Sequence, residues 1–297
     1  MGEIKERENM INQKSVLKLI SKLGDMSFKR RFLKLIDYLN QENHNSKMRI
    51  LDVGCGEGFY LMSLCALTDH EIVGIEYDEE LVSKTLHWIR TSEVKNLPQV
   101  IKGDATNLNF EDNSFDFVIC SEVLEHIDDD IKAANEIYRI LKPGGRAFVT
   151  VPNLNYPLIW DPLNWFRKNL NLGHFSSTNT WFGGVWSYDH KRLYLPEQIK
   201  QVLHNAGFSV KDICVLTHYG VPFNVLLLQI LKKLFTAPIV PSFIKDSAEK
   251  FTARDENSKN FFKIPLLILN KIDALNNQEF ELQRSTMNVA LLVQKNR

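Results

Sequence analysis

The segment that most constrains the fold is Arg49–Phe59, RILDVGCGEGF, in which an apolar run ends in Asp52 and is followed by three glycines at alternate positions. The apolar residues before the glycines favour a β-strand, and the apolar spacing of residues 57–67 is typical of a helix that packs on a sheet. Glycine has no Cβ, so the turn can adopt positive φ angles and a ligand can approach its main chain closely. We therefore predict a nucleotide-type cradle. Its three glycines are Gly54, Gly56 and Gly58.

Four further strands are predicted directly after this turn, and a sixth and a seventh strand are predicted later, at residues 209–217 and 287–294. The first of them ends in Glu76, about twenty residues beyond the turn, as expected of a carboxylate that binds ribose hydroxyls. The carboxyl ends of parallel strands line one crevice, so the polar residues found there are expected to meet. Carboxylates at three of these ends suit hydroxyls and amines better than a pyrophosphate. The predicted strands are 71–76, 99–102 (before Gly103-Asp104-Ala105), 115–120 (before Ser121-Glu122) and 146–151.

Five motifs in this order resemble those of the class I methyltransferases that use S-adenosylmethionine (SAM): LDVGCGEG, GIEYD, GDA, FDFVICSEVLEH and RILKPGGRAFVTVPN. The resemblance implies an α/β fold with a Rossmann-like, doubly wound sheet of seven strands, of which strand seven is antiparallel. It also implies N-terminal helices and two insertions. The expected parts are the N-terminal helices or lid (1–47), the methyltransferase core (48–218 and 286–297), an aromatic cap inserted in it (153–195) and an apolar helical insertion (219–285).

The same resemblance implies roles for residues at the strand ends. Asp52 and the glycine turn would hold the methionine end of SAM, and Glu76 would bind the ribose hydroxyls. Tyr77 would flank the adenine, and Asp104 with Ala105 would bind its amino edge. Asp52 could instead cap the turn, and Tyr77 could simply pack. The predicted cofactor-binding residues are Asp52, Gly54, Cys55, Gly56, Gly58, Glu76, Tyr77, Asp104, Ala105, Ser121 and Glu122.

Composition fits one enlarged domain, since 44% of the 297 residues are hydrophobic and 24% are charged. The formal net charge is zero, which removes the global attraction that many nucleic-acid binders use, so nucleic acid is not an expected partner. The four cysteines form no C-x-x-C pair, and the first ten residues carry charges where a signal peptide would be apolar. We expect a cytoplasmic protein, with attachment to the membrane surface as an alternative.

A second informative segment is SEVLEH, in which Glu122, Glu125 and His126 are spaced i, i+3 and i+4. On a helical turn these side chains would share a face and could bind a divalent metal such as Mg, Mn, Fe or Co. The alternative is a pocket without metal, in which the acidic residue contacts the cofactor. The segment resembles E-x-x-E-H in ubiquinone-biosynthesis O-methyltransferases and small-RNA 2′-O-methyltransferases. The second resemblance implies that His190 completes the metal ligands.

The stretch 153–195 contains four of the five tryptophans. Loops of this length are usually functional, so we predict an aromatic cap over the acceptor, with a small satellite core as the alternative. His190 and His126 are the predicted catalytic residues, because an imidazole titrates near neutrality and can take a proton from an acceptor hydroxyl. His174 is a further candidate base, and a histidine that only bonds the backbone is the alternative.

Helices are predicted before the core and in the second insertion. Residues 10–23 and 27–39 have helical apolar spacing, and the basic side chains of the second helix are expected to lie on a solvated face. The insertion 219–285 carries apolar runs shorter than the roughly 18 to 20 residues that span a bilayer. Two interpretations remain open. It could lie at the membrane interface and present a lipid-linked acceptor, or it could close the pocket or pair with another subunit.

These features predict a SAM-dependent methyltransferase that acts on an acceptor oxygen of a small or lipid-linked molecule. One alternative is a metal-dependent 2′-O-methyltransferase of RNA 3′ ends, and another is a non-catalytic SAM-binding relative. A dinucleotide dehydrogenase is disfavoured, because the turn lacks the third spaced glycine that suits a pyrophosphate at a helix N-terminus. Small metabolites, lipid-linked quinones or sugars and RNA ends all fit the predicted cap.

Overall fold

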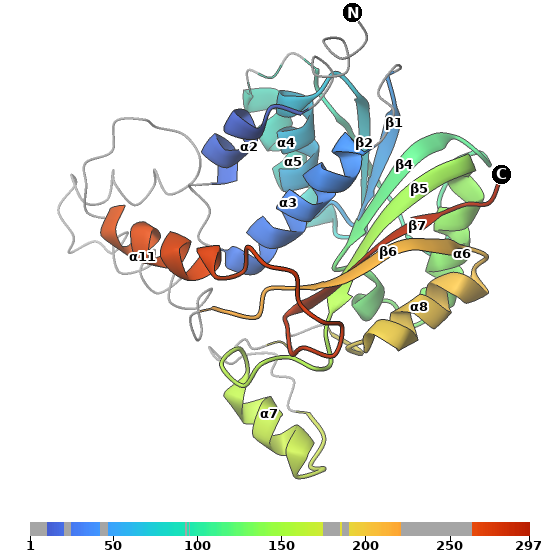
Figure 1. Cartoon of the computed structure of the whole chain (residues 1–297). Helices are drawn as coiled ribbons and strands as arrows, with labels where there is room; N and C mark the ends of the chain where they lie inside the picture. Colours follow the sequence, from blue (N-terminus) through green and yellow to red (C-terminus); the bar gives the residue numbers. More distant parts are fainter. Residues whose placement is uncertain are drawn as a thin grey trace, which may run out of the picture.

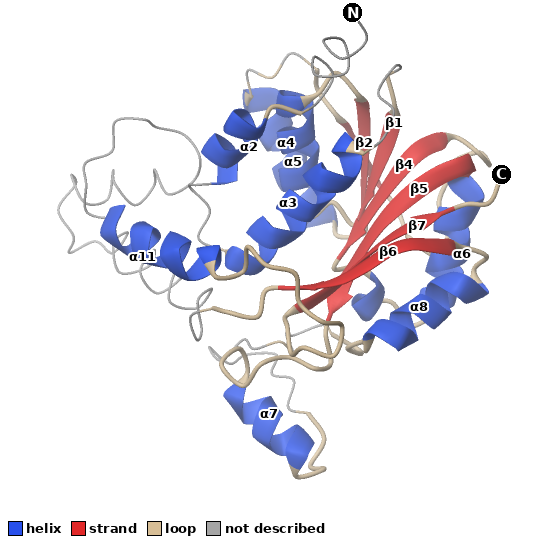
Figure 2. Cartoon of the chain, viewed as in Figure 1, coloured by secondary structure: helices blue, strands red, loops and turns tan. Residues whose placement is uncertain are grey.

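The computed structural model describes residues 11–20, 25–41, 47–92, 94, 96–174, 185, 190–220 and 263–297. These residues form a seven-stranded sheet with helices on both faces (Figure 1 and Figure 2). The strand order is β3-β2-β1-β4-β5-β7-β6, and β7 runs antiparallel to both of its neighbours. The predicted fold class, a Rossmann-like doubly wound α/β sheet with strand seven antiparallel, is confirmed.

The elements follow each other in an alternating βα pattern along most of the chain. The strands are β1 (Arg49–Val53), β2 (Glu71–Glu76), β3 (Gln99–Lys102), β4 (Phe115–Ser121), β5 (Leu141–Pro152), β6 (Ser209–Leu216) and β7 (Asn288–Gln294). The helices are α2 (Gln13–Ile20), α3 (Met26–Asn40), α4 (Phe59–Leu67), α5 (Glu79–Thr91), α6 (Asp130–Ile140), α7 (Pro162–Asn169), α8 (Pro196–Asn205), α11 (Lys263–Ala274) and the short 3-10 helix η1 (Leu124–His126).

Two element boundaries differ from the prediction for reasons of backbone geometry. β5 begins at Leu141 rather than at residue 146, because Leu141 already pairs with Phe115 before a shift in register. α4 begins at Phe59 rather than at residue 57, because Gly58 is left-handed, with φ of 80°, and serves as the N-cap. The glycine turn is therefore longer than its sequence pattern suggests, and it leaves more main chain exposed to a ligand.

The central strand β1 is buried on both faces, as is typical of a parallel sheet. Leu51 and Val53 belong to the apolar cluster that includes α6 and α8, whereas Ile50 belongs to the cluster that includes α2, α3 and α4. Among the four cysteines, Cys214 is half-buried and the others are buried, and all four are free thiols. The two apolar layers fix β1 so that its carboxyl end lies beside those of β2 and β4.

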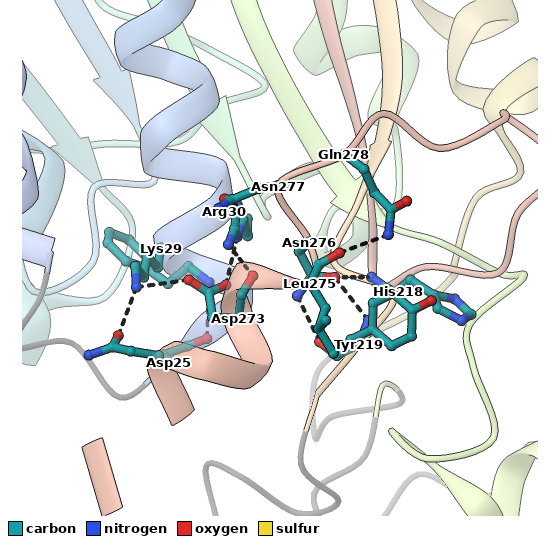
Figure 3. A network of polar contacts seen from close by, with 12 residues as sticks. Asp25, Lys29, Arg30, His218, Tyr219, Asp273, Leu275, Asn276, Asn277 and Gln278 are labelled. Atoms are coloured by element: carbon teal, nitrogen blue, oxygen red, sulfur yellow. Dashed lines mark hydrogen bonds and ion pairs between the residues drawn. The ribbon is translucent and has the colours of Figure 1, made fainter. Parts of the chain in front are cut away.

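The basic face of α3 is not solvated, so that prediction is wrong. Lys29 and Arg30 are 9% and 8% exposed, and both pair with Asp273 of α11 at 2.8 and 2.6 Å. Figure 3 shows these two cations directed at Asp273, with Asn277 beside Arg30. Asp273 lies 243 residues beyond Arg30 in the chain, so no local pattern could indicate this partner. This contact attaches α11, at the end of the second insertion, to the N-terminal helix α3.

The two insertions are described only in part. Trp160 and Trp165 join a small apolar cluster with Met26, Tyr156 and Leu269, which is the satellite core that was the alternative to a cap. Residues 175–184, 186–189 and 221–262 lie outside the described part, and with them two of the tryptophans and most of the apolar insertion. The division of the chain into four parts stays a prediction. None of the described helices has the length and apolar character needed to cross a bilayer.

Candidate active site

Glu76 ends β2, and three main-chain amides fix its carboxylate. Its Oε2 accepts a hydrogen bond from Gly56 N at 2.8 Å, and its Oε1 accepts from Tyr77 N at 2.8 Å and Asp78 N at 3.0 Å. Two further amides of the glycine turn donate to the Ile75 carbonyl, so the turn and the end of β2 form one rigid unit. A fixed carboxylate next to a glycine turn is the arrangement expected of a group that binds ribose hydroxyls.

The three glycines of the turn have different neighbours. All have positive φ, namely 68° at Gly54, 54° at Gly56 and 80° at Gly58. A Cβ on Gly54 would lie 2.6 Å from Val123, and a Cβ on Gly58 would lie 2.5 Å from Thr85, so the protein itself fills the space beside these two. A Cβ on Gly56 would meet nothing within 4 Å. Gly56 is therefore the position at which the turn leaves room for a ligand.

Asp52 lies near the end of β1 as a buried carboxyl group. It is 1% exposed, and its Oδ2 has no hydrogen-bond partner within the described structure. Burial and the neighbouring charge of Glu76 raise the pKa of Asp52 well above its usual range. An ammonium group placed there would favour the ionised form and offset the desolvation. The methionine end of SAM carries such an ammonium, so these residues fit the cofactor.

The residues predicted around the adenine lie at the ends of β2 and β3. Tyr77 is 75% exposed, so one face of its ring is accessible to a planar ligand. Asp104 follows β3, and its Oδ1 accepts from both the amide and the hydroxyl of Thr106. The side chain of Cys55 is buried in the core, so Cys55 offers only its main chain to a ligand. The adenine contacts of Tyr77, Asp104 and Ala105 stay a prediction.

Glu122 does not share a helical face with Glu125 and His126, so that part of the metal prediction is wrong. The backbone of Glu122 is left-handed, with φ of 58°, and only the next three-residue turn, η1, is helical. The i, i+3, i+4 spacing therefore does not place the three side chains together. The described residues that do come together as metal-ligand candidates are Glu125, His126 and His190.

The carboxylate of Glu122 is instead the centre of a polar network at the strand ends. It accepts hydrogen bonds from Thr150 and Asn288, both at 2.9 Å, and pairs with Arg31 at 3.0 Å. Thr150 also lies 2.9 Å from the hydroxyl of Ser121. These partners come from β5, β7 and α3. Sequence reasoning did not assign Arg31, Thr150 and Asn288 to the site. Thr150 lies within the motif RILKPGGRAFVTVPN, but only the tertiary fold brings these three residues to Glu122.

Glu125, His126 and His190 form a compact group next to this network. One ligand atom from each lies within 4.8 Å of the others. Glu125 is fully buried, and neither of its carboxylate oxygens has a hydrogen-bond partner in the described residues. Its Oε1 lies 3.8 Å from His126 Nε2 and 3.9 Å from His190 Nε2. Burial and the charge of Glu122 raise the pKa of Glu125 well above its usual range.

The backbone orients the ring of His190. Its Nδ1 lies 2.7 Å from the carbonyl oxygen of Val185, and a carbonyl only accepts, so Nδ1 donates. In the neutral ring Nε2 then keeps its lone pair on the side of Glu125, as a metal ligand or a general base requires. The rings of His126 and His190 contact each other edge to face at 4.8 Å. His174 lies in the exposed stretch after α7 and is not part of this group.

Comparison with known proteins identifies the type of domain that forms the core of the chain. The methyltransferase domain family matches residues 51–149. Sterol 24-C-methyltransferase of Clavispora lusitaniae is 36% identical over 57% of this chain and 42% of its own length. Ubiquinone biosynthesis O-methyltransferase of Pseudomonas putida is 28% identical over 62% of this chain and 74% of its own length. The chain thus spans less than half the length of the sterol methyltransferase that it matches.

Solved structures share the fold at low sequence identity. Phosphoethanolamine N-methyltransferase 2 of Haemonchus contortus, in complex with SAM, has a TM-score of 0.53 at 17% identity, over 96% of this chain and 58% of that chain. The cyclase SpnF has a TM-score of 0.52 at 20% identity, over 89% of this chain and 81% of that chain. These likenesses show the fold alone. The glycine cradle, the fixed carboxylate of Glu76 and the family match over residues 51–149 agree with this fold. Residues 51–149 therefore carry a methyltransferase domain of the class I, SAM-dependent type.

Proposed function

We propose that this protein is an enzyme that transfers a methyl group from SAM to an acceptor oxygen of a small or lipid-linked molecule. The observation that carries the proposal is the carboxylate of Glu76, held by three amides beside the open side of Gly56. The buried, unpaired oxygen of Asp52 supports it. The names of similar proteins support a lipid-like acceptor, since they include a sterol, a ubiquinone-biosynthesis and a demethylmenaquinone methyltransferase.

Bound SAM would supply an activated methyl group for displacement at carbon. The residues of the chain bind and orient the cofactor and the acceptor, and they move a proton. Glu76 binds the ribose hydroxyls, and Asp52 pairs with the ammonium, so that most of the rate comes from placement and desolvation. His190, whose Nδ1 is occupied by the Val185 carbonyl, takes the proton of an acceptor hydroxyl at Nε2. In its ionised form, the buried carboxyl group of Glu125 then stabilises the imidazolium.

A second candidate role for the same group is metal binding. A fully buried carboxylate with two unpaired oxygens next to two imidazoles is a donor set that Mn, Fe or Co would satisfy. We infer that Glu125, His126 and His190 hold such an ion, which would neutralise the buried charge and lower the pKa of an acceptor hydroxyl. Calorimetric titration of the chelator-treated protein with Mn²⁺ and Co²⁺ tests this directly. Binding that is lost in Glu125→Gln and kept in Asp112→Asn supports the site, and no binding in wild type leaves the histidines to act alone.

The methyltransferase proposal is tested in two steps. Mass spectrometry of the purified protein should detect SAM or its demethylated product, and calorimetry should show SAM binding that Glu76→Ala weakens. Methyl transfer from labelled SAM is then measured into lipid, small-molecule and RNA fractions, with and without chelator. Transfer into lipid or small molecules supports the proposal, and transfer confined to RNA supports the RNA alternative. SAM binding without transfer into any fraction would identify a non-catalytic relative, and the absence of SAM binding would refute the cradle.

A further inference from the structure

Helix α7 carries an apolar face that is turned to solvent. Leu163, Phe166 and Leu170 are 53%, 56% and 66% exposed, and their i, i+3, i+7 spacing places them on one side of the helix. Of the fifteen large apolar side chains that are exposed in the described part of the chain, six lie within residues 158–172. We define the α7 face by these six residues: Leu158, Ile159, Leu163, Phe166, Leu170 and Leu172. A concentrated apolar patch of this kind marks an interaction surface.

The opposite side of α7 is firmly attached to the protein. Asp161 and Asn164 are 4% and 5% exposed, and Asp161 accepts hydrogen bonds from the amide and the side chain of Asn164. Trp165 packs against the apolar cluster of Tyr156 and Trp160. The helix therefore cannot turn to bury its apolar face without breaking these contacts. Figure 1 shows α7 standing away from the sheet, beyond the end of β5.

Within residues 154–174, which carry the α7 face, the charges that are not buried have one sign. In residues 154–174 the only acidic residue is Asp161, which is buried. Two cations lie in the last turn, where Arg167 donates to the Leu172 carbonyl and Lys168 to the Leu154 carbonyl. Arg167 is thereby held beside Leu172 of the α7 face, and Lys168 is held beside Leu154, which packs on the small apolar cluster. An apolar face whose own segment, residues 154–174, adds two cations and no exposed acid matches a bilayer that carries anionic headgroups. It does not match a second copy of the same face, which would oppose these cations with cations.

We propose that the α7 face docks this protein on the surface of an anionic lipid bilayer. Leu163, Phe166 and Leu170 enter the boundary between headgroups and acyl chains, and Arg167 and Lys168 contact the headgroups. Helix α7 follows β5 and lies beyond the carboxyl end of that strand (Figure 2), so docking brings this end of the sheet near the membrane. The sequence left a membrane contact of residues 219–285 open as one of two alternatives, and most of that stretch lies outside the described residues. The α7 face is a separate candidate in the first insertion.

Flotation of the full-length protein with vesicles tests the proposal. The vesicles are phosphatidylcholine alone, and phosphatidylcholine with about one fifth phosphatidylglycerol. Wild type should float with the anionic vesicles and much less with the neutral ones. The variant Leu163→Ser/Phe166→Ser/Leu170→Ser should lower the bound fraction about tenfold or more. The matched control is Leu267→Ser/Ile268→Ser on α11, where the two side chains are 55% and 54% exposed, and it should float like wild type.

Three outcomes would overturn the proposal. Wild type that stays unbound with both vesicle types removes the bilayer as the partner. If the α7 variant binds as well as wild type, or if the α11 control loses as much binding as the α7 variant, the membrane contact lies elsewhere. A wild-type dimer that the α7 variant dissociates, with no vesicle binding, makes the face an interface between copies. Circular dichroism and SAM calorimetry on each variant verify that the fold is intact, so that lost flotation reports on the surface. Arg167→Gln/Lys168→Gln should reduce binding to anionic vesicles only.

Discussion

The contact between α3 and α11 allows a quantitative prediction. Asp273 has a side chain that is 3% exposed, and it is the shared anion of Lys29 and Arg30. The substitution Asp273→Asn keeps the shape of the side chain and removes its charge, which leaves two buried cations without a counter-charge. Breaking a buried ion pair in this way costs about 3–5 kcal/mol. Lys29 and Arg30 keep their hydrogen bonds to Asn270 and Asn277. We therefore expect the free energy of unfolding to fall by about 3 kcal/mol, near the lower end of that range.

Urea-induced unfolding, followed by circular dichroism, measures this loss. The control is Asp112→Asn, because Asp112 pairs with Arg139 at a similar distance but has a side chain that is 67% exposed, and its loss should cost less than about 1 kcal/mol. Replacing all three members by apolar residues, as Lys29→Met/Arg30→Met/Asp273→Leu, should cost far less than Asp273→Asn alone or even stabilise the protein. Equal effects of Asp273→Asn and Asp112→Asn would refute the claim that α3 and α11 share a buried ionic contact.

Three further predictions concern the cofactor edge. Gly56→Ala should lower the free energy of unfolding by about 1–2 kcal/mol because of its positive φ, and it should weaken SAM binding about tenfold or more. Gly54→Ala should mainly destabilise the fold, because the added Cβ overlaps with Val123. Calorimetry measures the change in SAM binding, and thermal melting measures the change in stability. Glu76→Gln should lower SAM affinity about 10- to 100-fold, and unchanged affinity would remove Glu76 from the site. Burial and the charge of Glu76 raise the pKa of Asp52, so SAM binding should release a proton and tighten as pH rises. The raised pKa also means that Asp52 stabilises the unliganded fold at low pH and that this contribution is lost as pH rises through that pKa. Asp52→Asn should abolish the proton release, and buffers of different ionisation enthalpy measure it.

The parts of the site that the sequence predicted correctly are local ones. Glu76 and the glycine turn are joined by hydrogen bonds between adjacent strand ends, and both carry signals in residue type and spacing. The order of the strands along the chain could be predicted from the motifs, because apolar runs and stop signals alternate regularly along the core. Local rules sufficed here, since a parallel sheet brings consecutive strand ends to one edge.

The parts that failed depend on geometry or on distant partners. We expected Glu122, Glu125 and His126 to share one face of a helix, but Glu122 has a left-handed backbone and lies outside the short helix that contains the other two. His190 joins Glu125 and His126 through the tertiary fold, and only the family resemblance pointed to it. Arg30 looked like a residue of a solvated face because its anion lies hundreds of positions away. Hydrophobic and charge patterns report the environment of a residue only when its partners are near in sequence.

One hydrogen bond at the strand ends has a consequence for how the protein folds. Ser27 donates to Asn288 at 2.6 Å across a separation of 261 residues, and Asn288 in turn donates to Glu122. Closing so long a loop is entropically costly, so we expect this link to form late. A refolding chain would then assemble the ribose-binding corner first and the Glu122 corner last. Because Glu122 is also a predicted cofactor-binding residue, full SAM affinity measured during refolding should lag behind the recovery of sheet signal, and simultaneous recovery would contradict this order.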